Sequence, residues 1–352
     1  MNLIMKNIIY FILSFVCVLV LLDIFISLAS IETKSPNDFT EEYGRCRKSD
    51  MDYVYFNEGF SMGKFNAGRY LNSFYPKEKP NNVIRIGVIG DSYVEAFQVF
   101  ERDHFIKITE RKLNNENIDS VQILNFGRSG FDFGDMYVYY ERLMKQYNCD
   151  INLFFVNNID LNIKQNDVLI PKLKYSNKKL IITNDEVPKQ YKESFINQIL
   201  LSNLSSIYKM LNDSRKQIKS GELLPKLLDK FYRTSEVNKN NSSVEELNFQ
   251  TSDLSFKILL KLQKEKSKII IVNRDKVNLD SAFTSAINRP LLYFNLTKES
   301  KLYKNNNDMH YWNVSKKYGH WNVEGHKIIS ESLSKFLSNL KSEYRNTDKL
   351  EK

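Results

Sequence analysis

Ser92 is the residue whose surroundings best suit a nucleophile. It follows Gly90 and Asp91, directly after the apolar, β-branched run 83–89. Such a run predicts a buried strand, so Ser92 would lie at the carboxyl edge of a sheet, after a tight turn that Gly90 permits. A helix that starts there would direct backbone N–H groups toward Ser92, where they can stabilise an oxyanion. The expected chemistry is attack of the Ser92 hydroxyl on an acyl carbonyl.

Three other polar segments have matching positions. Segment 125–130 (Asn-Phe-Gly-Arg-Ser-Gly) follows a second predicted strand, segment 157–158 (Asn-Asn) follows a third, and segment 319–326 (Gly-His-Trp-Asn-Val-Glu-Gly-His) precedes the last predicted helix. Glycine lets backbone approach a ligand closely, asparagine can offer an amide hydrogen to negative charge, and histidine can take a proton. We expect all of them to converge with Ser92 at one sheet edge.

The elements that must position these segments alternate regularly. Strands are predicted at 83–89, 121–126, 151–156, 268–272 and 291–294, and helices at 104–113, 136–147, 251–264 and after Gly325. Strands that are apolar on both faces and alternate with helices indicate a parallel sheet covered on two sides. The sequence therefore predicts an α/β fold, a three-layer α/β/α sandwich with a parallel sheet of about five strands.

The predicted body, 83–340, carries additions. Residues 32–82 form a stalk and a lead-in that packs on the body, and 341–352 form a polar tail. Between the third and fourth strands lies a helical insertion, 161–250. One stripe of a predicted helix in it is apolar: Ile196, Leu200, Leu204, Ile207 and Leu211. Insertions at strand exits usually surround the site of such sheets, so this one is either a lid or a surface helical hairpin.

The amino-terminal run 8–31 is apolar enough to cross a membrane. As a helix its 24 residues would span about 36 Å, against roughly 30 Å of hydrocarbon. Lys6 before the run predicts a cytoplasmic amino terminus and an extracytoplasmic body, periplasmic or at the cell surface. Asp23 would lie in the outer third of the span, where water can be reached. The alternative is a cleaved signal peptide, with Ser27 and Ala29 as the small residues of a cleavage site.

Composition excludes several classes. The net charge is +9, but the lysines are scattered and no nucleic-acid-binding motif is present, so no nucleic-acid partner is expected. No cluster of Cys and His predicts a metal, and no cofactor is expected. Cys46 and Cys149 could pair in an oxidising compartment or remain free thiols, whereas Cys17 lies in the apolar run.

The four polar segments together resemble the SGNH/GDSL hydrolase superfamily. The likeness is nearest to membrane-anchored members associated with bacterial surface polysaccharide, and it spans about 84–340 without the insertion. Its more specific parts are 90–99 and 320–326. The resemblance implies a flavodoxin-like SGNH fold, with Ser92 as the nucleophile and His320 as the base.

The same resemblance implies the oxyanion donors. They would be the backbone N–H groups of Ser92 and Gly130 and the side chain of Asn158. Gly127 is the alternative for the second segment, and Asn157 for the third.

The chain departs from the family at the catalytic acid. A carboxylate should lie two or three residues before His320, but these positions hold Tyr318 and Lys317. Three readings stay open: Asp308 reaches His320 from the preceding loop, a backbone carbonyl orients the ring, or the site is degenerate.

Further aromatic and histidine side chains surround the predicted base. Trp321 and His310 are candidates for substrate binding, Trp321 as a platform for a sugar, although a buried structural role suits a tryptophan equally. His326, beside Gly325, has a packing or capping role or replaces His320 as the base.

The predicted function is ester chemistry outside the cytoplasm. Water as the acceptor gives an esterase, whereas a sugar hydroxyl gives an O-acyltransferase, for which a membrane protein would deliver the acyl group. The substrate would be an acylated glycan. The alternative is a non-catalytic scaffold or binding protein of surface-polysaccharide assembly.

Overall fold

A computed structural model gives the fold of the chain. It describes residues 3–29, 36–55, 58–115, 120–166, 169–184, 205–208, 210–211, 215, 250–301, 303–304 and 307–348. The chain divides into two compact units. One combines Met1–Asn37 with Tyr191–Leu247, and the other, the body, combines Asp38–Gln190 with Asn248–Lys352.

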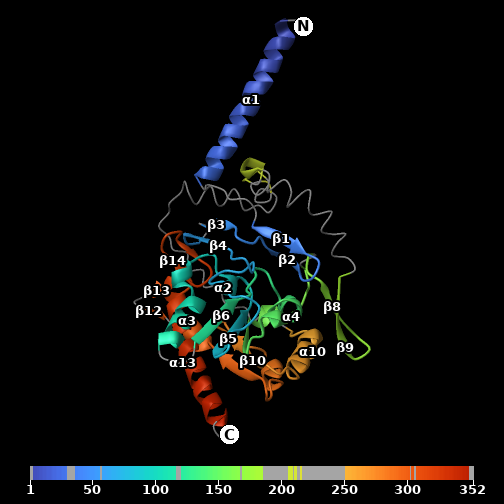
Figure 1. The fold of residues 1–352 in the computed structure, drawn as a ribbon, viewed down its shortest axis with the longest axis vertical. Coiled ribbons are helices and arrows are strands. Elements are labelled where there is room, and N and C mark those ends of the chain that lie inside the picture. The colour runs from blue at the N-terminus through green and yellow to red at the C-terminus, as the bar shows by residue number, and fades with distance from the viewer. Residues whose placement is uncertain are drawn as a thin grey trace. The chain divides into compact units, whose positions relative to one another are not determined.

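The body is built on a five-stranded parallel sheet (Figure 1). Its strands are β5 (Val83–Ile89), β6 (Ser120–Asn125), β7 (Ile151–Val156), β10 (Lys268–Asn273) and β11 (Leu292–Asn295). Their order across the sheet is β11-β10-β7-β5-β6, which is the flavodoxin-like order 2-1-3-4-5. The predicted parallel sheet of five strands is confirmed.

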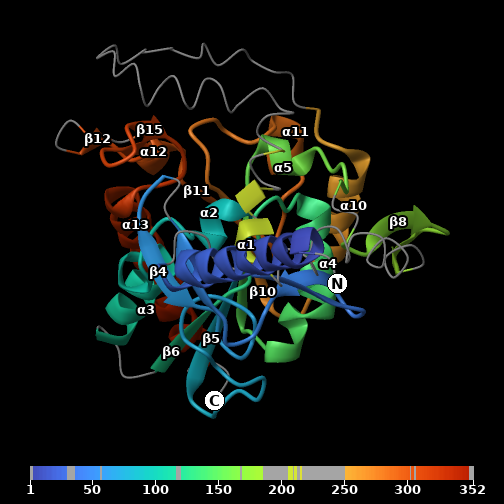
Figure 2. The same cartoon turned by 90° about the horizontal axis from the view of Figure 1, so that it is seen from above.

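Helices cover both faces of the sheet, as the two perpendicular views show (Figures 1 and 2). Helices α3 (Phe105–Asn115) and α13 (Val323–Asp348) bury apolar side chains with one face, and α4 (Phe133–Arg142) and α10 (Asp253–Leu262) with the other. Successive strand residues point to opposite faces, so strands covered on both sides are apolar along most of their length. The three-layer α/β/α prediction is confirmed.

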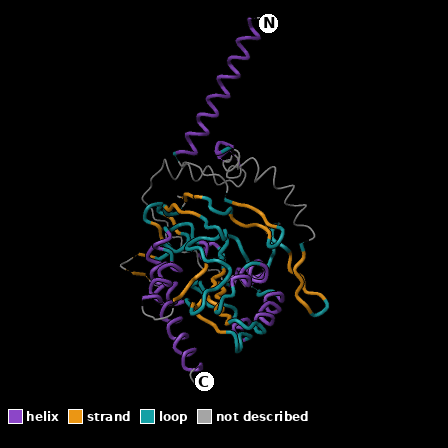
Figure 3. Tube along the Cα trace, in the orientation of Figure 1, coloured by secondary structure: helices purple, strands orange, loops and turns teal. Residues whose placement is uncertain are grey.

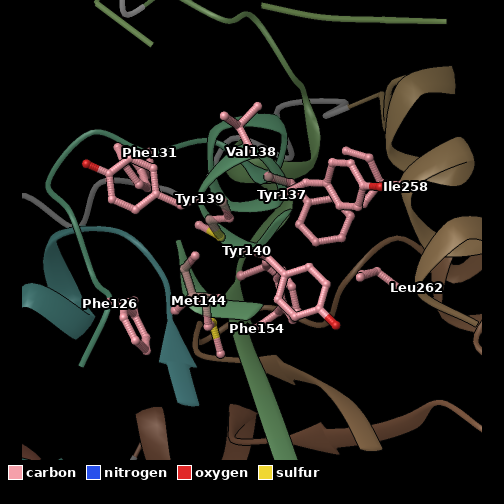
Figure 4. Close-up of a cluster of buried hydrophobic side chains, with 14 of the residues drawn as sticks. Phe126, Phe131, Tyr137, Val138, Tyr139, Tyr140, Met144, Phe154, Ile258 and Leu262 are labelled. Carbon is pink, nitrogen blue, oxygen red and sulfur yellow. The ribbon is translucent and has the colours of Figure 1, made fainter. Parts of the chain in front are cut away.

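The core under α4 and α10 is rich in aromatic rings (Figure 4). Tyr140 packs against Phe154 of β7 with a centroid distance of 5.3 Å, and Phe133 packs edge-on to the same ring at 5.9 Å. Edge-to-face contacts at these distances stabilise a core beyond simple burial of area. This layer therefore packs directly against β7.

Four short strands precede the sheet and pack on the body. They are β1 (Asn37–Thr40), β2 (Gly44–Arg47), β3 (Asp52–Tyr55) and β4 (Ser61–Lys64). The Tyr139 hydroxyl on α4 donates to the Arg45 carbonyl of β2, and Ser61 Oγ of β4 donates to the Phe97 carbonyl. The segment after the apolar helix is therefore part of the folded body.

The insertion begins with strands instead of helix. Strands β8 (Lys172–Ser176) and β9 (Lys179–Thr183) form an antiparallel hairpin at the side of the body (Figure 3). Its inner face buries Leu173 against the α4 core. Of the predicted apolar stripe, Ile196, Leu200 and Leu204 lie outside the described residues, while Ile207 is partly buried and Leu211 is exposed.

The unit that contains the amino terminus includes one long helix, α1 (Leu3–Leu28). Its segment Ile4–Leu28 has a mean hydropathy of 2.8 and meets the length and composition needed to cross a membrane. A signal sequence meets the same criteria. The Asp23 carboxylate accepts hydrogen bonds from Ser205 Oγ at 2.8 Å and from the Ile207 N–H at 2.9 Å, so part of the insertion is attached to this helix.

The remaining elements are short and connect the larger ones. They are α2 (Ser92–Glu95), η1 (Glu101–Asp103), η2 (Met144–Tyr147), α5 (Asn158–Leu161), α11 (Ser281–Ser285), α12 (Thr297–Ser300), β12 (Tyr303–Lys304), β13 (Asn307–Asp308), β14 (Tyr311–Trp312) and β15 (Lys317–Tyr318).

Candidate active site

Ser92 lies where the order of the sheet reverses. Strand β5 has β6 on one side and β7 on the other, so the chain leaves β5 toward one edge and later returns to the opposite side. Ligands of open α/β sheets bind outside the carboxyl ends of the strands at such a reversal. Ser92 is the first residue of α2, and the Asp91 side chain caps this helix by accepting from the Tyr93 N–H at 3.0 Å.

His320 contacts Ser92 directly. Its Nε2 lies 2.6 Å from Ser92 Oγ, although 228 positions separate the two residues. The imidazole reaches this place from the connection between β15 and α13, and the Tyr93 ring packs beside it with a centroid distance of 4.7 Å. The structure thus brings together the two residues predicted as nucleophile and base.

The carboxylate beside His320 is that of Glu58, which the sequence analysis missed. Both Glu58 oxygens lie 2.9 Å from His320 Nδ1, and Oε2 also accepts from the His320 N–H at 3.2 Å. A carboxylate can only accept hydrogen bonds, so Nδ1 carries the proton and Nε2 presents its lone pair to Ser92. This is the arrangement of a nucleophile, a base and an orienting acid.

Two glycines make room for Glu58. A side chain at Gly319 would place its Cβ 2.5 Å from the carboxyl carbon of Glu58. A Cβ at Gly59 would lie 2.1 Å from the Trp312 ring, which in turn donates from its Nε1 to the His320 carbonyl at 2.9 Å. The loop that carries Glu58 therefore sits directly against the loop that carries His320.

Asp308 does not hold His320, and this prediction is corrected. Its Oδ1 accepts from the His310 N–H at 2.8 Å, and its Oδ2 lies 3.7 Å from Lys276 Nζ. Asp308 ends the short strand β13 and caps the turn that follows, so its carboxylate is used within its own loop. Both ring nitrogens of His320 already have partners in Ser92 and Glu58.

Two predicted oxyanion donors have unengaged backbone N–H groups. Within the described part of the chain, no group accepts from the N–H of Ser92 or of Gly130. Gly130 has a φ of +82°, a conformation that favours glycine, and a Cβ there would have nothing within 4 Å. Gly127, the alternative, instead packs against the nucleophile helix, where a Cβ would lie 2.4 Å from the Glu95 nitrogen.

The two asparagines after β7 are engaged elsewhere. Asn158 Nδ2 donates to the Asn278 carbonyl at 2.9 Å, and its Oδ1 accepts from the Asp280 N–H at 2.8 Å. Asn157 caps α5 through the Asp160 N–H. The role of Asn158 as the third oxyanion donor stays a prediction. To donate to an oxyanion, its amide must use its second hydrogen or break its hydrogen bond with the Asn278 carbonyl.

Trp321 is not a substrate platform. It is completely buried, with its ring edge-on to Tyr93 at 5.1 Å and to Phe105 at 5.8 Å, and it belongs to the core beneath α13. Trp321 lies at the base of the last helix, where its large ring fills the corner between sheet and helix.

His310 and His326 are also buried. His310 Nδ1 lies 3.1 Å from the Gly319 carbonyl, and burial, together with the positive charge of Lys276, lowers the pKa of His310 to about 4. His326 Nδ1 accepts from the Phe105 N–H at 3.2 Å, and burial lowers its pKa well below the ordinary value. His326 therefore packs between helices, whereas His310 supports the loop of His320.

A buried charge cluster lies under the nucleophile turn. Arg274, at the exit of β10, donates to Asp91 Oδ2 at 2.6 Å, lies 3.3 Å from Asp160 Oδ2, and stacks on the Tyr93 ring at 4.3 Å. Burial raises the pKa of Asp160 above its ordinary value, against the opposing charge of Arg274. Arg274 thus anchors the helix cap next to Ser92.

The described residues contain no group of three or more His, Cys, Asp or Glu side chains placed to hold a metal ion.

Cys46 and Cys149 are buried and unpaired, so the disulfide alternative does not hold in this structure. Burial raises the pKa of the Cys149 thiol to about 12, and an uncharged thiol of this kind packs as a small apolar group.

Comparison with known proteins finds likeness at the level of structure. No family model matches the chain, and no curated protein matches it significantly. Solved structures similar to the chain include a lipase from a goat rumen metagenome, TesA and an acetyl xylan esterase.

These structures are distant from the chain. Their sequence identities are 12%, 11% and 14%, and their TM-scores 0.32, 0.36 and 0.34; they cover 71%, 73% and 71% of this chain and 95%, 99% and 98% of their own. What the protein does is therefore inferred from the geometry of Ser92, His320 and Glu58.

Proposed function

We propose that the protein is a serine-dependent ester hydrolase or O-acyltransferase that works through an acyl-enzyme on Ser92. One observation carries the proposal: an unbroken chain of hydrogen bonds runs from Ser92 Oγ through His320 to Glu58. A carboxylate that fixes the tautomer of a histidine beside a serine hydroxyl is the arrangement that activates a serine for acyl transfer.

Each residue has a defined part in the first half-reaction. Ser92 Oγ attacks the acyl carbonyl while His320 Nε2 takes the hydroxyl proton, and Glu58 stabilises the resulting imidazolium. The N–H groups of Ser92 and Gly130 donate to the oxyanion of the tetrahedral intermediate. His320 then gives its proton to the leaving alcohol, and the acyl group remains on Ser92.

The second half-reaction decides between the two activities. Water deprotonated by His320 releases a carboxylic acid, whereas a sugar hydroxyl takes the acyl group and gives a new ester. The same nucleophile serves both outcomes. Transfer also requires a supply of acyl groups, which we propose a partner membrane protein delivers.

An acylated glycan outside the cytoplasm is the proposed substrate. The long apolar helix α1 supports a membrane anchor, and exposed aromatic rings next to the site support a sugar as the acceptor. Tyr318, two residues before His320, is 60% exposed, and Phe60, two residues after Glu58, is 50% exposed. These rings take the place of Trp321 as candidates for stacking on a sugar.

The test is covalent labelling of the full chain with a fluorophosphonate probe. We expect labelling at Ser92, its loss in Ser92→Ala, and unchanged labelling in Ser281→Ala, a control at the start of α11. Hydrolysis of p-nitrophenyl acetate then reports turnover, and its rise with added oligosaccharide reports transfer. A folded protein that neither labels nor hydrolyses any ester overturns the proposal in favour of a scaffold.

A further inference from the structure

The carboxylate of Glu95 is buried directly behind the proposed oxyanion site. Glu95 is the last residue of α2, three positions after Ser92, and its side chain is completely inaccessible to solvent. Carboxylates are almost never fully buried unless they are paired. None of the proposed chemical steps uses this group, so its burial needs another explanation.

Two elements supply its partners. Arg47 of β2 forms a bidentate ion pair with Glu95, with both N–O distances at 2.7 Å. Ser129, in the loop after β6, donates to Glu95 Oε2 from its N–H at 2.8 Å and from its hydroxyl at 2.5 Å. Charge-assisted hydrogen bonds of this length are strong and geometrically restrictive.

The peptide that follows Ser129 carries the Gly130 N–H. Arg45 Nη2 holds the carbonyl oxygen of Ser129 at 3.0 Å, while Glu95 holds its N–H. The N–H and the carbonyl group of Ser129 are therefore both fixed. Because the peptide bond is planar, the direction of the Gly130 N–H follows from that of the Ser129 carbonyl. The conformation of Gly130, with φ at +82°, cannot by itself restrict the peptide, since glycine populates both signs of φ.

The loop that contains Ser129 also packs against α2, the helix that begins with Ser92. Gly127 packs against the Glu95 backbone, and the Arg128 N–H donates to the Gly90 carbonyl at 3.0 Å. The helix that starts with the Ser92 N–H and the loop that presents the Gly130 N–H are therefore joined by these backbone contacts and, next to Gly130, by the Glu95 side chain.

We propose that Glu95 is a positioning residue for the reaction, which holds the N–H of Gly130 in register with that of Ser92 through Ser129. This inference rests on the proposed function and deepens it. Oxyanion donors accelerate a reaction only if they are already aligned where the charge develops. Loss of Glu95 therefore lowers turnover without removing any group that touches the substrate.

The experiment compares Glu95→Gln with Glu110→Gln in the full chain, using p-nitrophenyl acetate as the substrate. Glu110 on α3 is the matched control, since it is also a buried carboxylate that accepts from a backbone N–H, that of Ile123 at 2.8 Å. We expect kcat to fall ten- to a hundredfold in Glu95→Gln, with KM changed less than threefold. This loss of kcat is smaller than the roughly 10²–10³-fold loss that follows removal of a whole oxyanion donor. Glu110→Gln should change only thermal stability.

Phenylboronic acid provides a readout that a purely structural role would not move. Its adduct with a serine is tetrahedral and places an oxygen in the oxyanion site, so its inhibition constant should rise in parallel with the loss of kcat. Ser129→Ala removes only the hydroxyl contact with Glu95 and provides a second test if Glu95→Gln does not fold. We expect its kcat to fall three- to tenfold. A folded Glu95→Gln with unchanged kcat and boronate affinity overturns the positioning role. Failure of the wild type to label with a fluorophosphonate instead overturns the proposed function itself.

Discussion

The Glu58 carboxylate lies 2.9 Å from Nδ1 of His320, across 262 positions of sequence. The acid comes from the connection between β3 and β4, before the sheet, whereas the base comes from the loop before the last helix. The segment between the apolar helix and the sheet is therefore part of the site, and removing it would leave His320 without its partner.

Replacing Glu58 with glutamine tests this pairing. The amide keeps the shape but no longer stabilises an imidazolium or enforces one tautomer, so kcat should fall by roughly 10³–10⁴. Asp308→Asn is the matched control at the acid expected from sequence, and its kcat should stay within about threefold of the wild type. Steady-state hydrolysis of p-nitrophenyl acetate measures both. If Asp308→Asn loses far more kcat than Glu58→Gln, the catalytic acid is Asp308 and not Glu58.

A methyl group at position 319 should disable the site without unfolding it. In Gly319→Ala the new Cβ would lie 2.5 Å from the Glu58 carboxyl carbon, and the flexible end of Glu58 can move away from His320. We expect kcat to approach that of Glu58→Gln, while the melting temperature changes little. In a Glu58→Ala background the same substitution should have no further effect, because contacting residues are not additive. Additive losses of kcat would contradict the mechanism.

Acid should destabilise the wild type more than Glu95→Gln. Burial raises the pKa of Glu95, but the charge and hydrogen bonds of Arg47 and the hydrogen bond of Ser129 outweigh it and lower the pKa from 4.5 to about 2. The folded pKa is below the unfolded one, so this stabilisation is complete above pH 4.5 and is lost as pH falls toward 2. Between pH 6 and 3 the loss is on the order of 2 kcal/mol.

Urea unfolding at pH 6 and pH 3 measures this difference. The gap in unfolding free energy between the wild type and Glu95→Gln should narrow at pH 3, since the other carboxylates are common to both proteins. A gap that is the same at both pH values would mean that the pKa of Glu95 is the same in the folded and the unfolded chain, so that Arg47 and Ser129 do not lower it.

The direction of the chain across the membrane is tested by a fusion. We expect a reporter placed after Lys352 to behave as exported, because Lys6 precedes the apolar run and acidic residues follow it. Mass spectrometry of the purified protein separates an anchor, which keeps residues 1–29, from a cleaved signal. A cytoplasmic reporter signal would refute the extracytoplasmic location.

The sequence alone determined the layers of the fold and two residues of the site. Runs such as 151–156 are apolar at every position except Asn152, which is typical of strands buried on both faces, so the parallel sheet and its helices were predictable. Ser92 could be placed at the carboxyl edge of the sheet because it follows a predicted strand and a tight turn, and its pairing with His320 was expected from the resemblance of segments 90–99 and 320–326 to SGNH/GDSL hydrolases.

Only the tertiary structure decided which carboxylate serves His320 and which aromatic ring is exposed. Glu58 lies in a segment with no clear periodicity, and its approach depends on the missing side chain of Gly319 and on the packing of Gly59 against Trp312. Trp321 is buried because the last helix closes over it, which local sequence does not reveal. Contacts between segments that are distant in sequence form when the core packs, and their partners are set by shape in three dimensions instead of by spacing along the chain.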